Sequence, residues 1–289
     1  MKERILGALL LVLIFVPLLL LGDWPLALGL CAMSIVGEFE FARAMAAKGH
    51  VLFFIPQCVL TVLWYAALYL WKPVLPETGR VLGAYAGTAV VFLIWCIGSL
   101  ILFMILAVPG YPKRTLTETA CSFLSLLYVA GLLSFVWLLR EREAGLWLVG
   151  YLFAAAWGSD IFAYFAGRLF GRRKLAPELS PKKTVAGAVG GLLGGVILCL
   201  ACGWAFSRFG TAADTGLPLS RILWVSAAAG AVGALLGMTG DLFASSVKRQ
   251  TGVKDFGKLI PGHGGILDRF DSILMAAPAV WLVLALFMK

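Results

Sequence analysis

Charged side chains are scarce in this 289-residue chain. Asp, Glu, Lys and Arg make up 13% of it, whereas hydrophobic residues make up 61%, and the mean hydropathy is +0.95. Soluble domains contain about a quarter charged residues, and one of this size could not bury so much apolar surface. Disorder is excluded for the opposite reason, because disordered segments hold few apolar residues. The composition therefore indicates a polytopic membrane protein.

Histidine is nearly lacking, and no cysteine stands in a polar segment. With only His50 and His263 present, a His-rich zinc site is excluded. All six cysteines lie inside apolar runs, which is typical of small buried residues and not of a disulfide framework. Cys199 and Cys202 have the spacing of a redox pair, but a predicted membrane span contains both, so we interpret them as packing residues.

Acidic residues are outnumbered by basic ones, 15 to 24, which gives a net charge of +9. In a soluble protein this excess would suggest nucleic acid binding. In a membrane protein the cytoplasmic loops collect Lys and Arg, so no nucleic acid partner is expected. Anionic substrates or lipid headgroups are a second explanation of the excess.

Nine apolar stretches approach the roughly 20 residues that a membrane-spanning helix requires. We therefore predict an all-α, polytopic integral membrane protein with about nine transmembrane helices, the first of which is not a cleaved signal peptide. A tight hairpin at Asp23-Trp24-Pro25 is expected between the first two spans. The stretches are 5–22, 24–42, 51–71, 82–107, 118–139, 146–167, 185–206, 222–245 and 272–288.

The distribution of positive charge predicts the orientation of these spans. Of the 24 Lys and Arg residues, 17 lie on one side of the predicted spans and 7 on the other. The richer side is expected in the cytoplasm, which makes the N-terminus cytoplasmic. The loops 168–184 and 246–271 share that side, and a bacterial inner membrane suits so compact a protein.

No polar stretch is long enough to fold by itself, because the longest, 246–271, has 26 residues. The chain is therefore predicted to be a single membrane domain over 1–289. Its N-terminal spans would occupy 1–139, and its catalytic spans and cytoplasmic loops 146–289.

Two carboxylates fall inside predicted spans, where an ionisable group costs at least roughly 2.5–3.5 kcal/mol and is a functional hypothesis by default. Asp160 shares a helical face with Arg168, so a structural ion pair is the alternative interpretation. The polar residues on or near the face of Asp241 are Ser245, Lys248 and Arg249. Snorkelling at the membrane interface would explain the Lys and Arg, but not the carboxylate.

Other acidic residues have plainer interpretations. Glu38 and Glu40 lie near the predicted cytoplasmic end of the second span, where they could reach water. Thr115 and Glu118 have the spacing of a helix capping box, which predicts a structural and not a catalytic carboxylate.

The loop from Lys254 to Asp271 combines glycines with charged residues. Gly264 and Gly265 would open the backbone for close approach to a ligand. Asp268 and Asp271 are three residues apart and can face the same way at the start of the ninth span. Carboxylates beside Lys and Arg suit a Mg²⁺-bridged phosphate site, because hard oxygen ligands hold the metal and cations hold the remaining charge.

A second basic motif, Ser180-Pro-Lys-Lys-Thr184, is expected to open the seventh span. Ser180 is the predicted helix N-cap, with Pro181 at the first helical position. A helix N-terminus carrying Lys182 and Lys183 is an anion site, although ordinary capping and positive-inside charge explain the same residues. The glycines that follow predict a small-residue face for tight helix packing.

The run from Ser245 to Asp271 reads S-x-V-K-R-x4-K-D-x-G-x2-I-P-x-H-G-G-I-x-D-R-F-D over 27 residues. This motif resembles the sequence hallmark of the phosphatidate cytidylyltransferases (CDP-diacylglycerol synthases). The Asp160 segment and Ser180-Pro-Lys-Lys-Thr184 also resemble that family in order and spacing. The family's lysine motif commonly continues with a Glu where this chain has Ala186, which departs from the pattern.

The resemblance implies a reaction in phospholipid biosynthesis. CMP is transferred from CTP to phosphatidate with Mg²⁺, which gives CDP-diacylglycerol and pyrophosphate. The implied partners are CTP, phosphatidate and membrane lipid, and glycine-rich helix faces are compatible with a homodimer. The site would face the cytoplasm at membrane depth, because one substrate is a lipid and the other a soluble polyanion.

Each candidate residue receives an expected role within this resemblance. Asp241 and Asp268 would bind Mg²⁺ directly or through water, and Asp160 would bind a second cation or orient Arg168. The cations expected to hold phosphates are Lys248, Arg249 and Arg269. The residues expected to bind the triphosphate or the lipid phosphate are Ser180, Lys182, Lys183 and Thr184. The further candidates are Asp271 at the metal, and Ser245, Lys254, His263, Gly264 and Gly265 at the substrates.

Two other functions fit the same residues. An ion-coupled transporter of an anionic solute would also place Asp160 and Asp241 inside the membrane. Against it, the unusual motifs gather on one side only, with no counterpart for alternating access. A related CTP-dependent enzyme acting on another lipid phosphate or a polyprenol is the second alternative.

Overall fold

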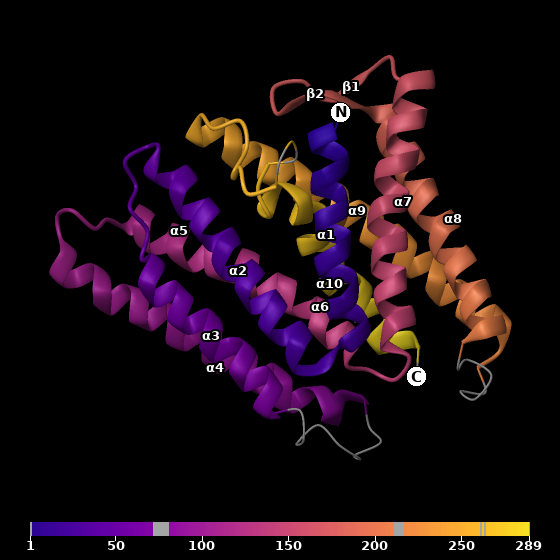
Figure 1. The fold of residues 1–289 in the computed structure, drawn as a ribbon, viewed down its shortest axis with the longest axis horizontal. Helices are drawn as coiled ribbons and strands as arrows, with labels where there is room; N and C mark the ends of the chain where they lie inside the picture. The colour runs from indigo at the N-terminus through magenta and orange to yellow at the C-terminus, as the bar shows by residue number, and fades with distance from the viewer. Residues whose placement is uncertain (1, 72–80, 211–216, 261, 263, 289) are drawn as a thin grey trace. The chain divides into compact units, whose positions relative to one another are not determined.

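The computed structural model describes residues 2–71, 81–210, 217–260, 262 and 264–288 (Figure 1). These residues are almost entirely helical, with one short β-hairpin. The helices are α1 (Lys2–Leu21), α2 (Asp23–Ala46), α3 (Phe54–Trp71), α4 (Val81–Ala107), α5 (Leu116–Leu126), α6 (Leu132–Arg140), α7 (Gly145–Phe170), α8 (Val185–Phe209), α9 (Leu219–Thr251) and α10 (Leu267–Phe287). A 3₁₀ turn, η2 (Val108–Gly110), follows α4, and a π-helical turn, η3 (Leu127–Gly131), joins α5 to α6.

The all-α membrane class predicted from the sequence is confirmed. Within the described residues, seven helical segments are long and apolar enough to cross a membrane, and two shorter apolar segments lie at Val12–Leu21 and Phe54–Leu70. Each of the nine predicted apolar stretches coincides with helix. The number of actual spans and the cytoplasmic N-terminus stay predictions.

The chain forms two compact units, which do not follow the order of the sequence. The first unit comprises Met1–Trp137 and Gln250–Arg269, and the second comprises Leu138–Arg249 and Phe270–Lys289. The glycine-rich loop after α9 therefore belongs with the N-terminal helices. The sequence-based expectation of one membrane domain stays a prediction.

The first unit contains the expected tight hairpin between α1 and α2, but the turn is at Gly22 and not at Asp23-Trp24-Pro25, which already belong to α2. One residue, Gly22, separates the two helices and has φ 65°, a left-handed conformation that glycine adopts without strain. The predicted capping box at the start of α5 is also confirmed, since Thr115 and Glu118 satisfy each other's backbone groups. Glu118 additionally contacts His50 Nδ1 at 2.8 Å, so its role is structural.

The prediction that Glu38 and Glu40 reach water is wrong. Glu38 is 0% exposed and Glu40 3% exposed. Glu38 accepts a hydrogen bond of 2.6 Å from Thr61 Oγ1 on α3, and Glu40 accepts two from backbone N–H groups of residues 266 and 267. A buried carboxylate needs such donors because burial removes its water.

The helices of the second unit pack against one another at glycines. The small-residue face that follows Thr184 in the sequence predicts this packing. A side chain at Gly158 or Gly191 would press on the facing helix of the α7–α8 pair, and Gly195 and Gly230 bring α8 and α9 together. On α9, Gly240 lies against the backbone of Asp271 on α10. Close backbone approach of this kind is the usual basis of helix packing in membranes.

The expected helix start at Ser180 is wrong. Ser180–Thr184 forms strand β2, which pairs antiparallel with β1 (Lys174–Ala176) in a hairpin at one end of the α7–α8 pair (Figure 1). Helix α8 begins at Val185, and Thr184 is its N-cap, with Oγ1 accepting from Gly187 N at 3.0 Å. The residue before a proline avoids helical geometry, and β1 supplies the partners that keep the segment extended.

Candidate active site

The second unit contains a pocket of about 410 Å³ that joins the lysine motif to two of the intramembrane carboxylates. We call it the lysine pocket. Its polar lining consists of Asp160, Tyr164, Arg168, Lys182, Lys183, Thr184 and Asp241, and apolar residues from α7, α8, α9 and strand β1 complete it. Three segments that the sequence singled out separately therefore meet in one place.

An ion pair connects two of these segments. Lys183 Nζ lies 2.6 Å from Asp241 Oδ2, and both side chains are partly exposed to the pocket. Ser245 Oγ, one turn further along α9, lies 3.5 Å from the other oxygen of Asp241. The lysine thus stands beside Asp241 where a cation would be expected to bind.

Asp271 extends the acidic character of this region. It lies on α10 where Gly240 of α9 makes its close approach, and its Oδ1 accepts from Ser272 N at 2.7 Å. It belongs to the same compact unit as Asp160 and Asp241. Three of the four predicted metal ligands therefore belong to the second unit.

Two further basic residues that the sequence singled out, Arg249 and Arg168, make hydrogen bonds near the hairpin and on α7. Arg249 Nε is 3.4 Å from the carbonyl oxygen of Leu179, next to Ser180, and so links the end of α9 to the hairpin. Arg168 Nη1 donates to Tyr164 Oη at 3.2 Å. The sequence placed Arg168 on the face of Asp160, and the structure places both of them and Tyr164 in the lysine pocket.

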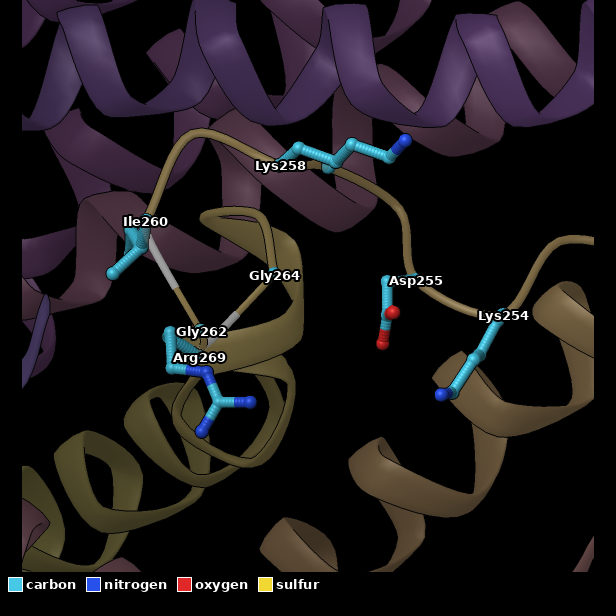
Figure 2. A pocket seen from close by; sticks show the side chains of 8 residues that line it. Lys254, Asp255, Lys258, Ile260, Gly262, Gly264 and Arg269 are labelled. Carbon is cyan, nitrogen blue, oxygen red and sulfur yellow. The ribbon is translucent and has the colours of Figure 1, made fainter. Parts of the chain in front are cut away.

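The first unit contains a second pocket, of about 690 Å³, formed by the loop after α9. We call it the loop pocket. Its lining consists of Lys254, Asp255, Gly257, Lys258, Ile260, Gly262, Gly264 and Arg269. Figure 2 shows the side chains of Lys254, Asp255 and Arg269 directed toward the same space. Asp255 and Lys258 were not predicted to bind substrate, although they belong to the same sequence motif.

Asp268 organises this loop from the start of α10. Its Oδ2 accepts from the backbone N–H groups of Phe256 at 2.8 Å, Gly257 at 3.4 Å and Gly265 at 3.0 Å, and the residue is 8% exposed. Gly265 belongs to the same loop and is buried. His263 lies outside the described residues. Asp268 has a structural role that the sequence did not predict, and its role at a metal stays a prediction.

The carboxylates of the lysine pocket suit a hard divalent cation in their chemistry. Among the residues that the structure describes, no three His, Cys, Asp or Glu side chains gather closely enough to form a complete cage. Mg²⁺ does not require one, because it keeps several water molecules and is usually held by one or two carboxylates together with substrate phosphates. Asp241 already pairs with one cation in this pocket, the ammonium group of Lys183.

An integral membrane protein whose pockets place carboxylates beside lysines and arginines belongs to the class that handles anionic groups at a membrane. Residues 2–287 match the cytidylyltransferase family, so the chain belongs to that family and is a nucleotidyltransferase. Enzymes of this family generally depend on a divalent cation. Family membership decides against the transporter alternative.

Similar proteins cover between 62% and 99% of the chain. The phosphatidate cytidylyltransferase of Bacillus subtilis (strain 168) is 32% identical over 290 residues, which cover 99% of this chain and 98% of that protein. The protein of the same name from Haemophilus influenzae is 33% identical, with 96% of each chain covered. The Brucella abortus protein (strain 2308) is 36% identical over 182 residues, or 62% of this chain and 58% of that protein.

Proposed function

We propose that this chain transfers CMP from CTP to phosphatidate, which gives CDP-diacylglycerol and pyrophosphate. The observation that carries the proposal is the ion pair between Lys183 and Asp241, because it joins the lysine motif to a carboxylate in a membrane-spanning helix. The names of the two relatives with nearly complete coverage support the choice of substrates.

The two substrates place different demands on the site. Phosphatidate requires contact with the membrane, and the lysine pocket supplies an apolar wall that includes Ala163, Leu175 and Met238. CTP is a soluble polyanion, so it requires cations that are open to water. We propose that Lys182, Lys183 and Thr184 bind a phosphate at the start of α8, where the helix dipole also favours an anion.

We propose that the divalent cation is Mg²⁺. Asp241 would bind it directly or through water, with Asp271 as a further candidate ligand; the sequence resemblance implies Asp241 and Asp268 for this role. When bound, the ion supplies electrostatic stabilisation of the negative charge on the reacting phosphates. Asp160 would hold a second cation or orient Arg168.

In the reaction, an oxygen of phosphatidate forms a bond to the α-phosphorus of CTP, and the bond to the bridging oxygen of the β-phosphate breaks. The nucleophilic oxygen is already anionic, so no strong general base is required. Positioning and charge stabilisation do most of the work in such transfers. We assign these tasks to Lys183, Lys248, Arg249 and Arg269, with Lys254 and the glycines Gly264 and Gly265 contributing in the loop pocket.

We further propose that the site opens to the cytoplasm at a bacterial inner membrane. The excess of Lys and Arg in 168–184 and 246–271 supports this side. The homodimer expected from the sequence stays a proposal, since the glycines described above pack against helices of the same chain.

One assay tests the proposal directly. Purified protein in detergent is given CTP labelled at the α-phosphate, phosphatidate and Mg²⁺, and the lipid fraction is analysed for a labelled product. The label should enter the lipid fraction, with one pyrophosphate released per product, and EDTA should stop the reaction. Parallel reactions with other lipid phosphates or a polyprenol as acceptor test the related enzymes, and a preference for one of these would overturn the assignment of phosphatidate.

A further inference from the structure

Glu40 holds the loop pocket together from a helix more than two hundred residues away in the sequence. Its carboxylate accepts hydrogen bonds from Ile266 N at 3.1 Å and Leu267 N at 3.0 Å, across separations of 226 and 227 residues. Leu267 is the first residue of α10. A helix N-terminus leaves such N–H groups without partners inside the helix and favours a negative charge beside them.

Two buried carboxylates therefore fix one loop by accepting hydrogen bonds from its backbone. Glu40 holds the N–H groups of residues 266 and 267, and Asp268 holds those of residues 256, 257 and 265. Together they fix five backbone donors in the segment that lines the loop pocket. Neither side chain reaches solvent to any large extent, so removal of either leaves donors buried without an acceptor.

Glu40 packs so closely against residue 265 that only glycine fits at that position. A Cβ atom built on Gly265 would overlap both carboxylate oxygens and Cδ of Glu40, which are its three nearest atoms. The backbone of Gly265 does not have positive φ, so an alanine there would be unstrained apart from this overlap. The glycine is required for space, and Glu40 is the group that requires it.

Helix α2 also contacts the other end of the loop, at Phe256. Arg43 Nη2 donates to the carbonyl oxygen of Phe256 at 2.5 Å. The rings of Phe41 and Phe256 stack with centroids 6.3 Å apart and an interplanar angle of 14°. Helix α2 thus fixes the loop near Lys254 and Asp255 at one end and near Arg269 at the other.

We propose that Glu40 is a positioning residue that sets the shape of the loop pocket for a phosphate-bearing substrate. The proposal rests on the proposed function for the identity of that substrate, which we take to be CTP. Glu40 does not line the loop pocket, and it acts through the backbone of residues 256–267. Helix α2, which lies outside the motifs that the sequence analysis singled out, would then contribute directly to activity.

Kinetics give the first test. Glu40→Ala should lower kcat/KM for CTP roughly 10- to 100-fold, since displacement of a catalytic loop by about 1 Å has effects of this size. Glu40→Gln keeps an acceptor oxygen and should recover part of the loss. Glu38→Ala is the matched control, because this buried carboxylate lies on the same helix and bonds Thr61 instead of the loop. Equal losses in Glu38→Ala and Glu40→Ala would overturn the proposal.

A double-mutant cycle with Gly265→Ala gives a sharper test. Gly265→Ala alone should lower both activity and thermal stability strongly, because the new methyl group displaces the Glu40 carboxylate. In the Glu40→Ala background the three atoms nearest to the new methyl group are removed, so the same substitution should cost clearly less in activity and in melting temperature than it does in the wild-type protein. Additive losses would show that the two sites are independent and would overturn the proposal.

Hydrogen exchange separates this inference from the proposed function, because it needs no substrate. Glu40→Ala should speed amide exchange in peptides that cover residues 256–267 and leave peptides from α8 unchanged. Unchanged exchange in the loop overturns the positioning role, even if cytidylyl transfer is observed. Faster exchange in a protein without cytidylyl transfer would instead uphold the role of Glu40 in shaping the loop and overturn the assignment of CTP as its ligand.

Discussion

Lys183 Nζ lies 2.6 Å from Asp241 Oδ2, so strand β2 and helix α9 each contribute one charge to the lysine pocket. We expect substrate and cation to replace this pair together. An arriving phosphate brings negative charge to Lys183, and an arriving divalent cation brings positive charge to Asp241. The pair keeps both charges compensated before either ligand binds.

Replacement of Lys183 by Gln should lower kcat/KM for CTP or phosphatidate roughly 10- to 100-fold. The reason is that a hydrogen bond to a charged group contributes about 1.5–3 kcal/mol. Lys183→Arg keeps the charge and should retain more activity than Lys183→Gln. Steady-state kinetics with each substrate varied in turn would show which phosphate Lys183 binds, and wild-type constants in Lys183→Gln would contradict its role.

Replacement of Asp241 by Asn should lower kcat at least about 100-fold, because loss of one preorganised electrostatic contact typically costs 10²–10³ in kcat. The concentration of Mg²⁺ needed for half-maximal rate should rise as well. Thr239→Ala on the same helix is a suitable control, since Thr239 is exposed and bonds only its own helix at Leu235. Equal activity in Asp241→Asn and the control would exclude a metal role for Asp241.

The hypothesis that Asp241 and Asp268 share one cation predicts the position of a bound metal. Fe²⁺ substituted for Mg²⁺ and treated with ascorbate and peroxide generates radicals that cut the backbone near the ion. Cleavage is expected close to both 241 and 268, as mapped by mass spectrometry, and should disappear with excess Mg²⁺. Cleavage at 160, 241 and 271 without any near 268 would restrict Asp268 to holding the loop.

The position of the α8 N-cap predicts unequal effects within the lysine motif. Thr184→Ala should destabilise the protein by about 1 kcal/mol, the usual cost of losing an N-cap side chain, whereas Thr184→Ser should be nearly neutral. Ser180→Ala should change stability less, because Ser180 lies in strand β2 and not at the helix start. Thermal unfolding in detergent measures all three, and a larger effect for Ser180→Ala would argue for the helix start expected from the sequence.

Some features followed from the sequence because they depend on neighbouring residues alone. The apolar stretches became helices with boundaries close to those expected, since hydrophobicity over about 20 residues is sufficient to select a membrane span. The capping box of Thr115 and Glu118 and the tight turn before Asp23 are local in the same sense. The motif from Ser245 to Asp271 was long enough to indicate the family, which full-length matching confirmed.

Other features escaped sequence analysis because their partners lie far along the chain. Glu40 has no neighbouring signal that would connect it with residues 266 and 267, so it was expected to reach water. Ser180-Pro181 has the composition of a helix start, but pairing with β1 keeps it extended and transfers the N-cap to Thr184. Nothing in the sequence predicts that the loop after α9 belongs to the unit of the N-terminal helices.

The amino-acid sequence alone determined that this protein is helical, lies in a membrane and carries cytidylyltransferase motifs, because each of these is encoded in contiguous residues. Only the tertiary structure decided which charges face one another. Lys183 meets Asp241, and Glu40 and Asp268 hold one loop. Such pairings are fixed by helix packing, which brings together residues whose separation along the chain carries no information about their distance in space.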